Sequence, residues 1–186
     1  MKNTICLIVL VVTSVLVGSK AKAQDYIREI DAKTGHPLLR GQIEFADLLH
    51  ESTCAWLGAG SASYKANAQA IEGIQALGGA YRYIIFAGTW CEDTQILLPQ
   101  FYALMQQAGI PKSAVLMYGL NRAKKALNQE EVVFDVTRVP TIIVLEQNRE
   151  IGRITETAGT SVEQDIYDMM LKDKKVLDNR KAARGL

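Results

Sequence analysis

The chain has 186 residues, of which 48% are hydrophobic and 22% are charged, a composition typical of one globular domain with its own core. Its 21 basic and 20 acidic residues give a formal net charge of +1, which argues against a surface for binding polyanions. The sequence carries no dinucleotide fingerprint and no basic, aromatic-rich surface pattern, so we expect no nucleic-acid partner and no cofactor.

The first 23 residues have the pattern of a secretory signal peptide. Lys2 precedes an uncharged apolar run from Ile5 to Gly18, and Ala21-Lys22-Ala23 places small residues where a signal peptidase reads them. The run is shorter than the roughly 20 residues that span a bilayer, so it does not predict a membrane anchor. We predict cleavage before Gln24 and export to the periplasm or the extracellular space.

Cleavage would change both the charge and the cysteine content of the chain. Residues 1–23 contain three lysines, no acid and Cys6. The mature chain would have 18 basic and 20 acidic residues, a net charge of −2, and would keep Cys54 and Cys91. Because disulfides persist in an exported protein, the question is whether these two cysteines pair.

Residues 24–63 are predicted to form a partly helical N-terminal extension. Residues 24–41 mix charges with Gly and Pro without a clear period, which indicates a loop. From Gln42 the apolar spacing predicts a helix that ends before Gly58-Ala59-Gly60, which we interpret as a flexible connection. Asn67 is expected to cap the next helix, which Gly78-Gly79 ends.

The most informative stretch is a strand that runs into a helix at Cys91. Residues 83–87 are apolar throughout, as expected for a central strand covered on both faces. Glu92 and Asp93 place carboxylates at the unpaired N–H groups of a helix start. The helix dipole favours a Cys91 thiolate and the two carboxylates disfavour it, so the sequence leaves the reactivity of Cys91 open.

The segment Trp90-Cys91-Glu92-Asp93-Thr94 resembles the active-site segment of the thioredoxin superfamily, in which the position of Thr94 holds a second cysteine. Arg138-Val139-Pro140-Thr141, followed by the apolar run 142–145, resembles the cis-proline loop of that family, and Pro99 matches the proline of its active-site helix. The resemblance covers about residues 64–172. The variant with a single cysteine is similar to bacterial envelope thioredoxin-like proteins.

This resemblance implies an α/β fold with a central mixed β-sheet of about four strands, flanked by helices. Strand 114–118 should lie parallel to the strand before Cys91, because a helix connects them. Strands 141–146 and 150–155 should form a hairpin, and a final helix should end in a polar tail, residues 173–186. The resemblance also implies a cis Val139-Pro140 bond beside Cys91, where the backbone of Val139 could pair with an extended peptide.

Two further segments complete the expected domain. Arg122, Lys124 and Lys125 form a small basic run that we interpret as a solvated face. Val132, Val133, Phe134 and Val136 are expected to pack beneath the Pro140 loop. Ile85 occupies the position where thioredoxins commonly hold a buried acid, which counts against thioredoxin-like reductase chemistry.

Three functions remain open. In the first, the protein is a thiol-disulfide oxidoreductase in which Cys91 forms a mixed disulfide with a client protein or a small thiol. Thr94 cannot resolve this disulfide, so an external reducing thiol must, although Thr94 could donate a weak hydrogen bond to the thiolate. In the second, Cys54 is a distant partner of Cys91 rather than a buried core residue. In the third, a redox-silent module binds extended peptides in a groove formed by Trp90 and Pro140. His36 and His50 show no spacing that indicates a metal site.

Overall fold

The computed structural model describes residues 25–78 and 81–183, so the predicted signal peptide and its cleavage site lie outside the described residues. The sheet has six strands: β1 (Tyr26–Ile30), β2 (Pro37–Ile43), β3 (Tyr81–Ala87), β4 (Val115–Gly119), β5 (Thr141–Glu146) and β6 (Arg149–Thr155). The helices are α1 (Phe45–His50), α2 (Ala55–Ser63), α3 (Ala68–Leu77), α4 (Glu92–Ala108), α5 (Glu130–Val133) and α6 (Val162–Ala183). Two short 3-10 turns, η1 (Ser52–Cys54) and η2 (Lys112–Ala114), precede α2 and β4.

The strands form one mixed sheet in the order β1-β2-β4-β3-β5-β6. β3 and β4 are parallel, with Ile85 opposite Met117, and α4 connects them as predicted. The other neighbouring pairs are antiparallel. The predicted class, a mixed sheet flanked by helices, is confirmed, and the sheet has two strands more than expected.

Both additional strands come from the N-terminal extension, so the prediction of a loop over residues 24–41 was wrong. β1 and β2 form an antiparallel hairpin, and Leu38 and Leu39 of β2 are buried. β1 is an edge strand with mostly exposed side chains, including Ile27 and Ile30. The usual alternation of apolar and polar residues is therefore weak in its sequence.

The helices of the extension also differ from the prediction. α1 begins only at Phe45, after β2, and α2 contains Gly58-Ala59-Gly60, which we had interpreted as a connection. A Cβ atom added to Gly60 would lie 2.8 Å from Cβ of Pro99, so this glycine allows α2 to approach α4 closely. The predicted cap is confirmed, because the side-chain oxygen of Asn67 accepts hydrogen bonds from the first turn of α3.

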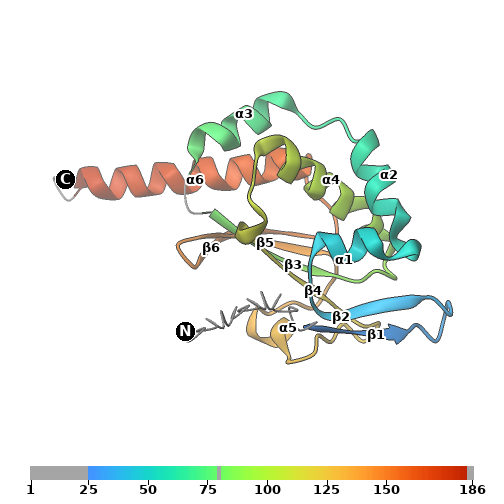
Figure 1. The fold of residues 1–186 in the computed structure, drawn as a ribbon. Helices are drawn as coiled ribbons and strands as arrows, with labels where there is room; N and C mark the ends of the chain where they lie inside the picture. Colours follow the sequence, from blue (N-terminus) through green and yellow to red (C-terminus); the bar gives the residue numbers. More distant parts are fainter. Residues whose placement is uncertain (1–24, 79–80, 184–186) are drawn as a thin grey trace, which may run out of the picture.

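The sheet separates two clusters of buried side chains. Helices α1, α2, α3, α4 and α6 lie on one face, while α5 and its adjoining loops lie on the other (Figure 1). The side chains of β3 alternate between the faces, since Tyr83 and Ile85 belong to the helix-covered cluster and Ile84 and Phe86 to the opposite one. β3 is thus buried on both sides, as its apolar sequence predicted.

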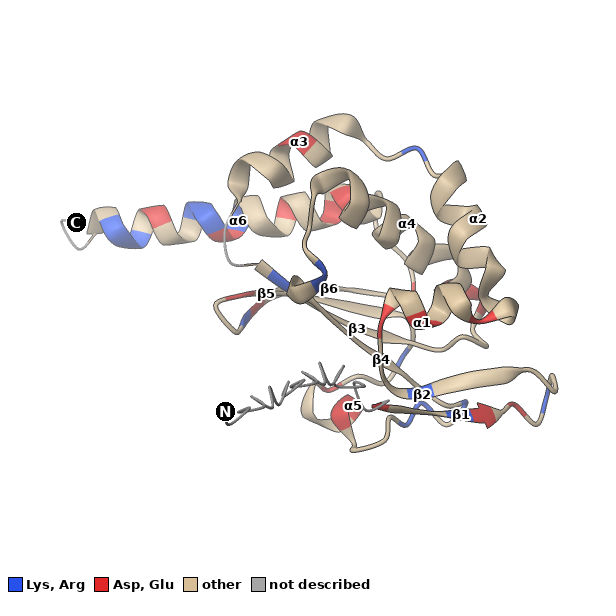
Figure 2. Ribbon diagram, in the orientation of Figure 1, with Lys and Arg blue, Asp and Glu red and all other residues tan. Residues whose placement is uncertain are grey.

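The last segments differ in part from expectation. On α5, Val132 and Val133 are exposed, so their predicted packing beneath the Pro140 loop was wrong, whereas Val136 is buried. α6 continues through the predicted tail as far as Ala183, and its C-terminal half carries interleaved acidic and basic residues and extends beyond the sheet (Figure 2). Within residues 25–78 and 81–183, no helix combines the length and apolar character needed to cross a membrane.

Candidate functional site

Cys91 is the N-cap residue of α4, at the end of the loop that leaves β3. Its backbone is extended, with φ −95° and ψ 125°, and its N–H donates to the Gly88 carbonyl at 2.9 Å. The Cys91 carbonyl accepts the first bond of the helix, from the Gln95 N–H at 3.1 Å. The thiol therefore lies at the positive end of the dipole of a 17-residue helix, whose first turn carries Glu92 and Asp93.

The second part of the site comes from the loop before β5. The Val139-Pro140 peptide bond is cis, as the resemblance implied. Sγ of Cys91 lies 3.3 Å from the Val139 carbonyl oxygen, to which the thiol donates a hydrogen bond. Val139 and Pro140 are buried, whereas Cys91 is partly exposed, so the residue that carries the thiol lies at the edge of this loop.

Thr94 is built into the loop rather than facing solvent. Its side chain is completely buried, and its hydroxyl oxygen accepts a hydrogen bond from the Gly88 N–H at 3.3 Å. Glu92 is exposed and Asp93 is partly buried at the first turn of α4. The residue three positions after Cys91 therefore supports the loop structurally and offers no second thiol.

Trp90 precedes Cys91, and its side chain has two polar contacts. Its indole N–H donates to the Leu120 carbonyl at 2.9 Å, and the guanidinium carbon of Arg122 lies 5.0 Å from the centre of its ring. The hydrogen bonds from Arg122 to Asp31 raise the pKa of Arg122, and negative charge on Cys91 raises it further. Because Arg122 pairs with Asp31 and lies over the Trp90 ring, the interpretation of this basic run as a purely solvated face was wrong for Arg122.

The partner of Arg122 comes from the N-terminal hairpin. Asp31 follows β1 in the turn that leads to β2, and its side chain is 3% exposed. Its two carboxylate oxygens accept hydrogen bonds from Nε and Nη2 of Arg122, both at 2.7 Å. It also accepts from the Thr34 hydroxyl at 2.7 Å and the Lys33 N–H at 3.1 Å. These contacts hold the pKa of Asp31 well below its usual range, with Arg122 the largest cause.

Cys54 lies apart from this site. It is 2% exposed and belongs to the cluster between the sheet and the helices, whereas Cys91 packs against the cluster on the opposite face. Burial raises the pKa of Cys54 to about 11, with a further contribution from the negative charge of Glu51. Both thiols are free. The structure therefore brings together Trp90, Cys91, Val139 and Pro140 but does not bring Cys54 to them.

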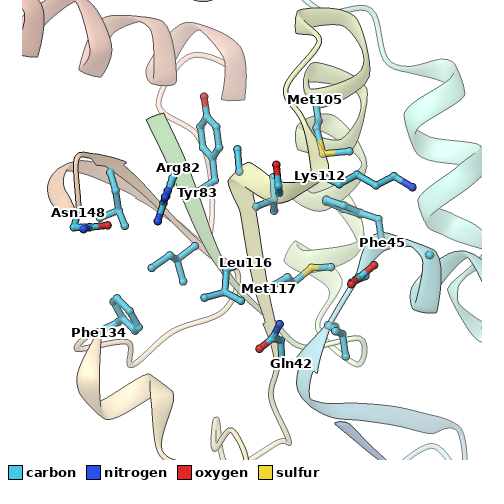
Figure 3. A pocket seen from close by; sticks show the side chains of 18 residues that line it. Gln42, Phe45, Arg82, Tyr83, Met105, Lys112, Leu116, Met117, Phe134 and Asn148 are labelled. Carbon is cyan, nitrogen blue, oxygen red and sulfur yellow. The ribbon is translucent and has the colours of Figure 1, made fainter. Parts of the chain in front are cut away.

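A cavity and a groove lie at different distances from Cys91. A cavity of about 630 Å³ lies around the start of β4, and Phe45, Met105, Leu116 and Phe134 are among its lining residues (Figure 3). No residue from 88–94 or 138–141 lines it, so it belongs to another part of the molecule. A smaller groove of about 330 Å³ follows the first turns of α4 and is lined in part by Asp93 and the exposed side chain of Ile96.

Sequence analysis missed Asp31 and Arg122. The two residues are 91 positions apart, and each stands in a segment that looked solvated, so no local pattern could pair them. Among the described residues, no group of three His, Cys, Asp or Glu side chains is arranged to hold a metal ion.

Comparisons with known proteins bear on the fold. No protein-family model matches this chain, and no curated protein matches its sequence. A Pseudomonas aeruginosa protein of unknown function has a similar structure, with a TM-score of 0.52 and 15% identity over 73% of this chain and 93% of its own. Fasciola hepatica thioredoxin matches 54% of this chain and 88% of its own, with a TM-score of 0.36 and 16% identity. The germline-specific thioredoxin Deadhead of Drosophila melanogaster covers the same shares, with a TM-score of 0.36 and 20% identity.

At such identities the likeness to the Pseudomonas protein shows a common fold and nothing about activity. The order of elements from β3 to α6 gives a more specific result. A parallel unit of β3, α4 and β4 precedes a hairpin of β5 and β6, and cis Pro140 stands beside the cysteine that begins α4. This arrangement is the thioredoxin-like fold that the sequence resemblance implied.

Proposed function

We propose that this chain is an exported thioredoxin-like protein that performs monothiol thiol-disulfide exchange through Cys91. The observation that supports this function is the position of Cys91, a free and partly exposed thiol at the start of α4, 3.3 Å from the Val139 carbonyl. Its substrates would be disulfides or thiols of client proteins or small molecules.

The proposed exchange has two steps. The Cys91 thiolate attacks one sulfur of a substrate disulfide, a new S–S bond forms, and the other substrate sulfur leaves as a thiolate that takes up a proton. Cys91 is thereby oxidised and the leaving thiol is reduced. Since Thr94 is a buried hydroxyl and Cys54 lies across the sheet, an external thiol must attack the mixed disulfide and release Cys91.

Export is the second part of the proposal, and it rests on the sequence alone. The apolar run from Ile5 to Gly18 and the Ala21-Lys22-Ala23 segment support cleavage before Gln24. N-terminal sequencing of the protein recovered from bacteria that express the full chain tests this directly. We expect a first residue of Gln24, and recovery of only the intact chain from Met1 would contradict export by cleavage.

A redox-silent peptide-binding module is the second candidate function. The groove that favours it is not the one expected between Trp90 and Pro140, since neither residue lines it. It lies beside α4, where Ile96 is 62% exposed next to Asp93 and close to the Cys91 end of the helix. An exposed apolar side chain in a groove with polar neighbours is typical of a peptide-contact surface. In this function Cys91 would take part in no thiol-disulfide exchange.

Reaction with a small neutral disulfide separates the two candidates. The full chain carrying Cys6→Ser is incubated with hydroxyethyl disulfide near neutral pH, and the mixed disulfide is followed by intact mass. We expect an adduct that Cys91→Ser abolishes, that Cys54→Ser leaves intact and that a small added thiol removes. If the folded protein forms an adduct only after denaturation, the exchange function is wrong.

A further inference from the structure

We propose that Arg122 determines the substrate specificity of the exchange at Cys91 by favouring small disulfides and thiols that carry an anionic group close to the sulfur. This inference rests on the proposed exchange function and adds to it a substrate class. It gives the N-terminal hairpin, which supplies Asp31, a role in the site.

The guanidinium of Arg122 is fixed in orientation. Its Nε and Nη2 donate to the two oxygens of Asp31, both at 2.7 Å, and its guanidinium carbon lies over the ring of Trp90, 5.0 Å from the ring centre. An arginine held by a two-point bond and by an aromatic face keeps one orientation without ordering a flexible side chain at each binding event. The positive group is therefore preorganised beside the residue that precedes Cys91.

The remaining edge of this guanidinium is available to a ligand. In the part of the chain that the structure describes, Nη1 of Arg122 has no hydrogen-bond partner, and the side chain is 33% exposed. Asp31 is 3% exposed, and its oxygens are occupied by Arg122, Thr34 and Lys33. A molecule that approaches the pair from solvent thus meets the arginine and not the carboxylate.

The charges around Cys91 are arranged unequally. Glu92 and Asp93 lie in the first turn of α4, whereas the guanidinium carbon of Arg122 lies 5.0 Å from the ring centre of Trp90, the residue before Cys91. A substrate with a carboxylate one or two carbons from its sulfur could place that group near Nη1 while its sulfur meets Cys91. A neutral substrate gains nothing from Arg122, and a cationic one is repelled by it.

The test compares three symmetric disulfides that differ in charge: anionic dithiodipropionate, neutral hydroxyethyl disulfide and cationic cystamine. Rate constants for mixed-disulfide formation at Cys91 are measured near neutral pH and low salt in the full chain carrying Cys6→Ser. We expect Arg122→Gln to lower the anionic-to-neutral rate ratio about fivefold, and Arg122→Lys, which keeps the charge, to retain most of it. Added salt should reduce the ratio in the wild type.

Two additional variants keep the result interpretable. Arg122→Gln leaves the buried Asp31 carboxylate without its partner. The double variant Asp31→Asn/Arg122→Gln removes both charges and puts two neutral amides in their place. Arg149→Gln is the matched control, because Arg149 also pairs with a buried aspartate, Asp173, but is the first residue of β6. The double variant should show the same lowered ratio as Arg122→Gln, and the control should show the wild-type ratio.

The outcomes distinguish this inference from the function on which it rests. If hydroxyethyl disulfide does not react with Cys91 of the folded wild type, the exchange function itself fails. If it does react, but the anionic-to-neutral ratio is the same in the wild type, Arg122→Gln and the double variant, the exchange function stands and the role of Arg122 is overturned.

Discussion

The two described cysteines have opposite surroundings, although both are free thiols. Cys91 is partly exposed at a helix start and donates to the Val139 carbonyl. Cys54 is 2% exposed among apolar side chains, and burial raises its pKa to about 11. A thiol in that environment is neutral at any physiological pH and is inaccessible to reagents dissolved in water.

This contrast predicts selective alkylation. In the full chain carrying Cys6→Ser, iodoacetamide near neutral pH should modify one thiol of the native protein and two after denaturation. Cys91→Ser should remove the native adduct, and Cys54→Ser should leave it. Peptide mass mapping identifies the modified residue, and an adduct on Cys54 of the native protein would contradict the burial described for it.

At the level of single residues, sequence patterns identified the candidate residues around Cys91 but not the nearby pair of Asp31 and Arg122. Trp90, Cys91, Val139 and Pro140 could be named because each belongs to a short pattern with a known counterpart. Arg122 could not, since its partner Asp31 is 91 positions away and becomes a neighbour only when the hairpin has packed against β4. Pairing between distant charges leaves no periodic signal in a sequence.

Among the elements, α2 and α4 pack closely and carry few charges. α2 has no charged residue, and in α4 none follows Asp93 (Figure 2). Contact between the helices depends on a glycine, because Gly60 faces Pro99 with no room for a Cβ atom. Gly58 of the same helix has room for a Cβ atom, because the nearest neighbour, a Leu49 methyl group, would lie 3.9 Å from it.

These two glycines give a matched pair of substitutions. Gly60→Ala should lower the free energy of unfolding, because overpacking costs about 1–3 kcal/mol and outweighs the gain in helix propensity. Gly58→Ala should raise it by up to about 1 kcal/mol, because alanine favours the helix and clashes with nothing. Urea midpoints measure both. Shifts of equal size and the same direction would show that α2 does not pack against Pro99 as described.

The same elements show why sequence patterns predicted some segments and not others. β3 could be predicted because its residues are apolar throughout, and α3 because its apolar residues recur at helical spacing and Asn67 provides a cap. α2 was interpreted as ending early because glycines usually interrupt helices, and only its packing against α4 explains their presence within it. β1 lies at the sheet edge with a mostly exposed face, so its sequence resembles that of a loop.

In the molecule as a whole, the contacts that join the hairpin to the rest of the domain include the pairing of β2 with β4 and the hydrogen bonds that Arg122 donates to Asp31. The pKa of Asp31 is lowered in the folded state, chiefly by Arg122. A carboxyl group with a depressed folded-state pKa stabilises the fold above its unfolded pKa of about 3.9. That contribution decreases as the pH falls below about 4 toward the folded-state value.

The expected result for Asp31→Asn follows from this linkage. The variant should have a lower urea midpoint than the wild type near neutral pH, and the difference should become smaller below about pH 4, where the wild-type carboxyl group becomes protonated in the unfolded chain. Asp178→Asn, on the exposed part of α6, is the control and should match the wild type at both pH values. A difference that stays constant with pH would exclude an ionised Asp31 as its source.

The hydrogen bond from Cys91 to Val139 also affects the order in which the site forms during synthesis. During translation, β3 and Cys91 are synthesised before Val139, Pro140 and β5, which follow later in the chain. Until then the cysteine has neither its carbonyl partner nor the neighbouring strand that covers one edge of β3. A nascent chain that ends before Val139 therefore has a Cys91 thiol without the carbonyl that accepts its hydrogen bond in the folded protein.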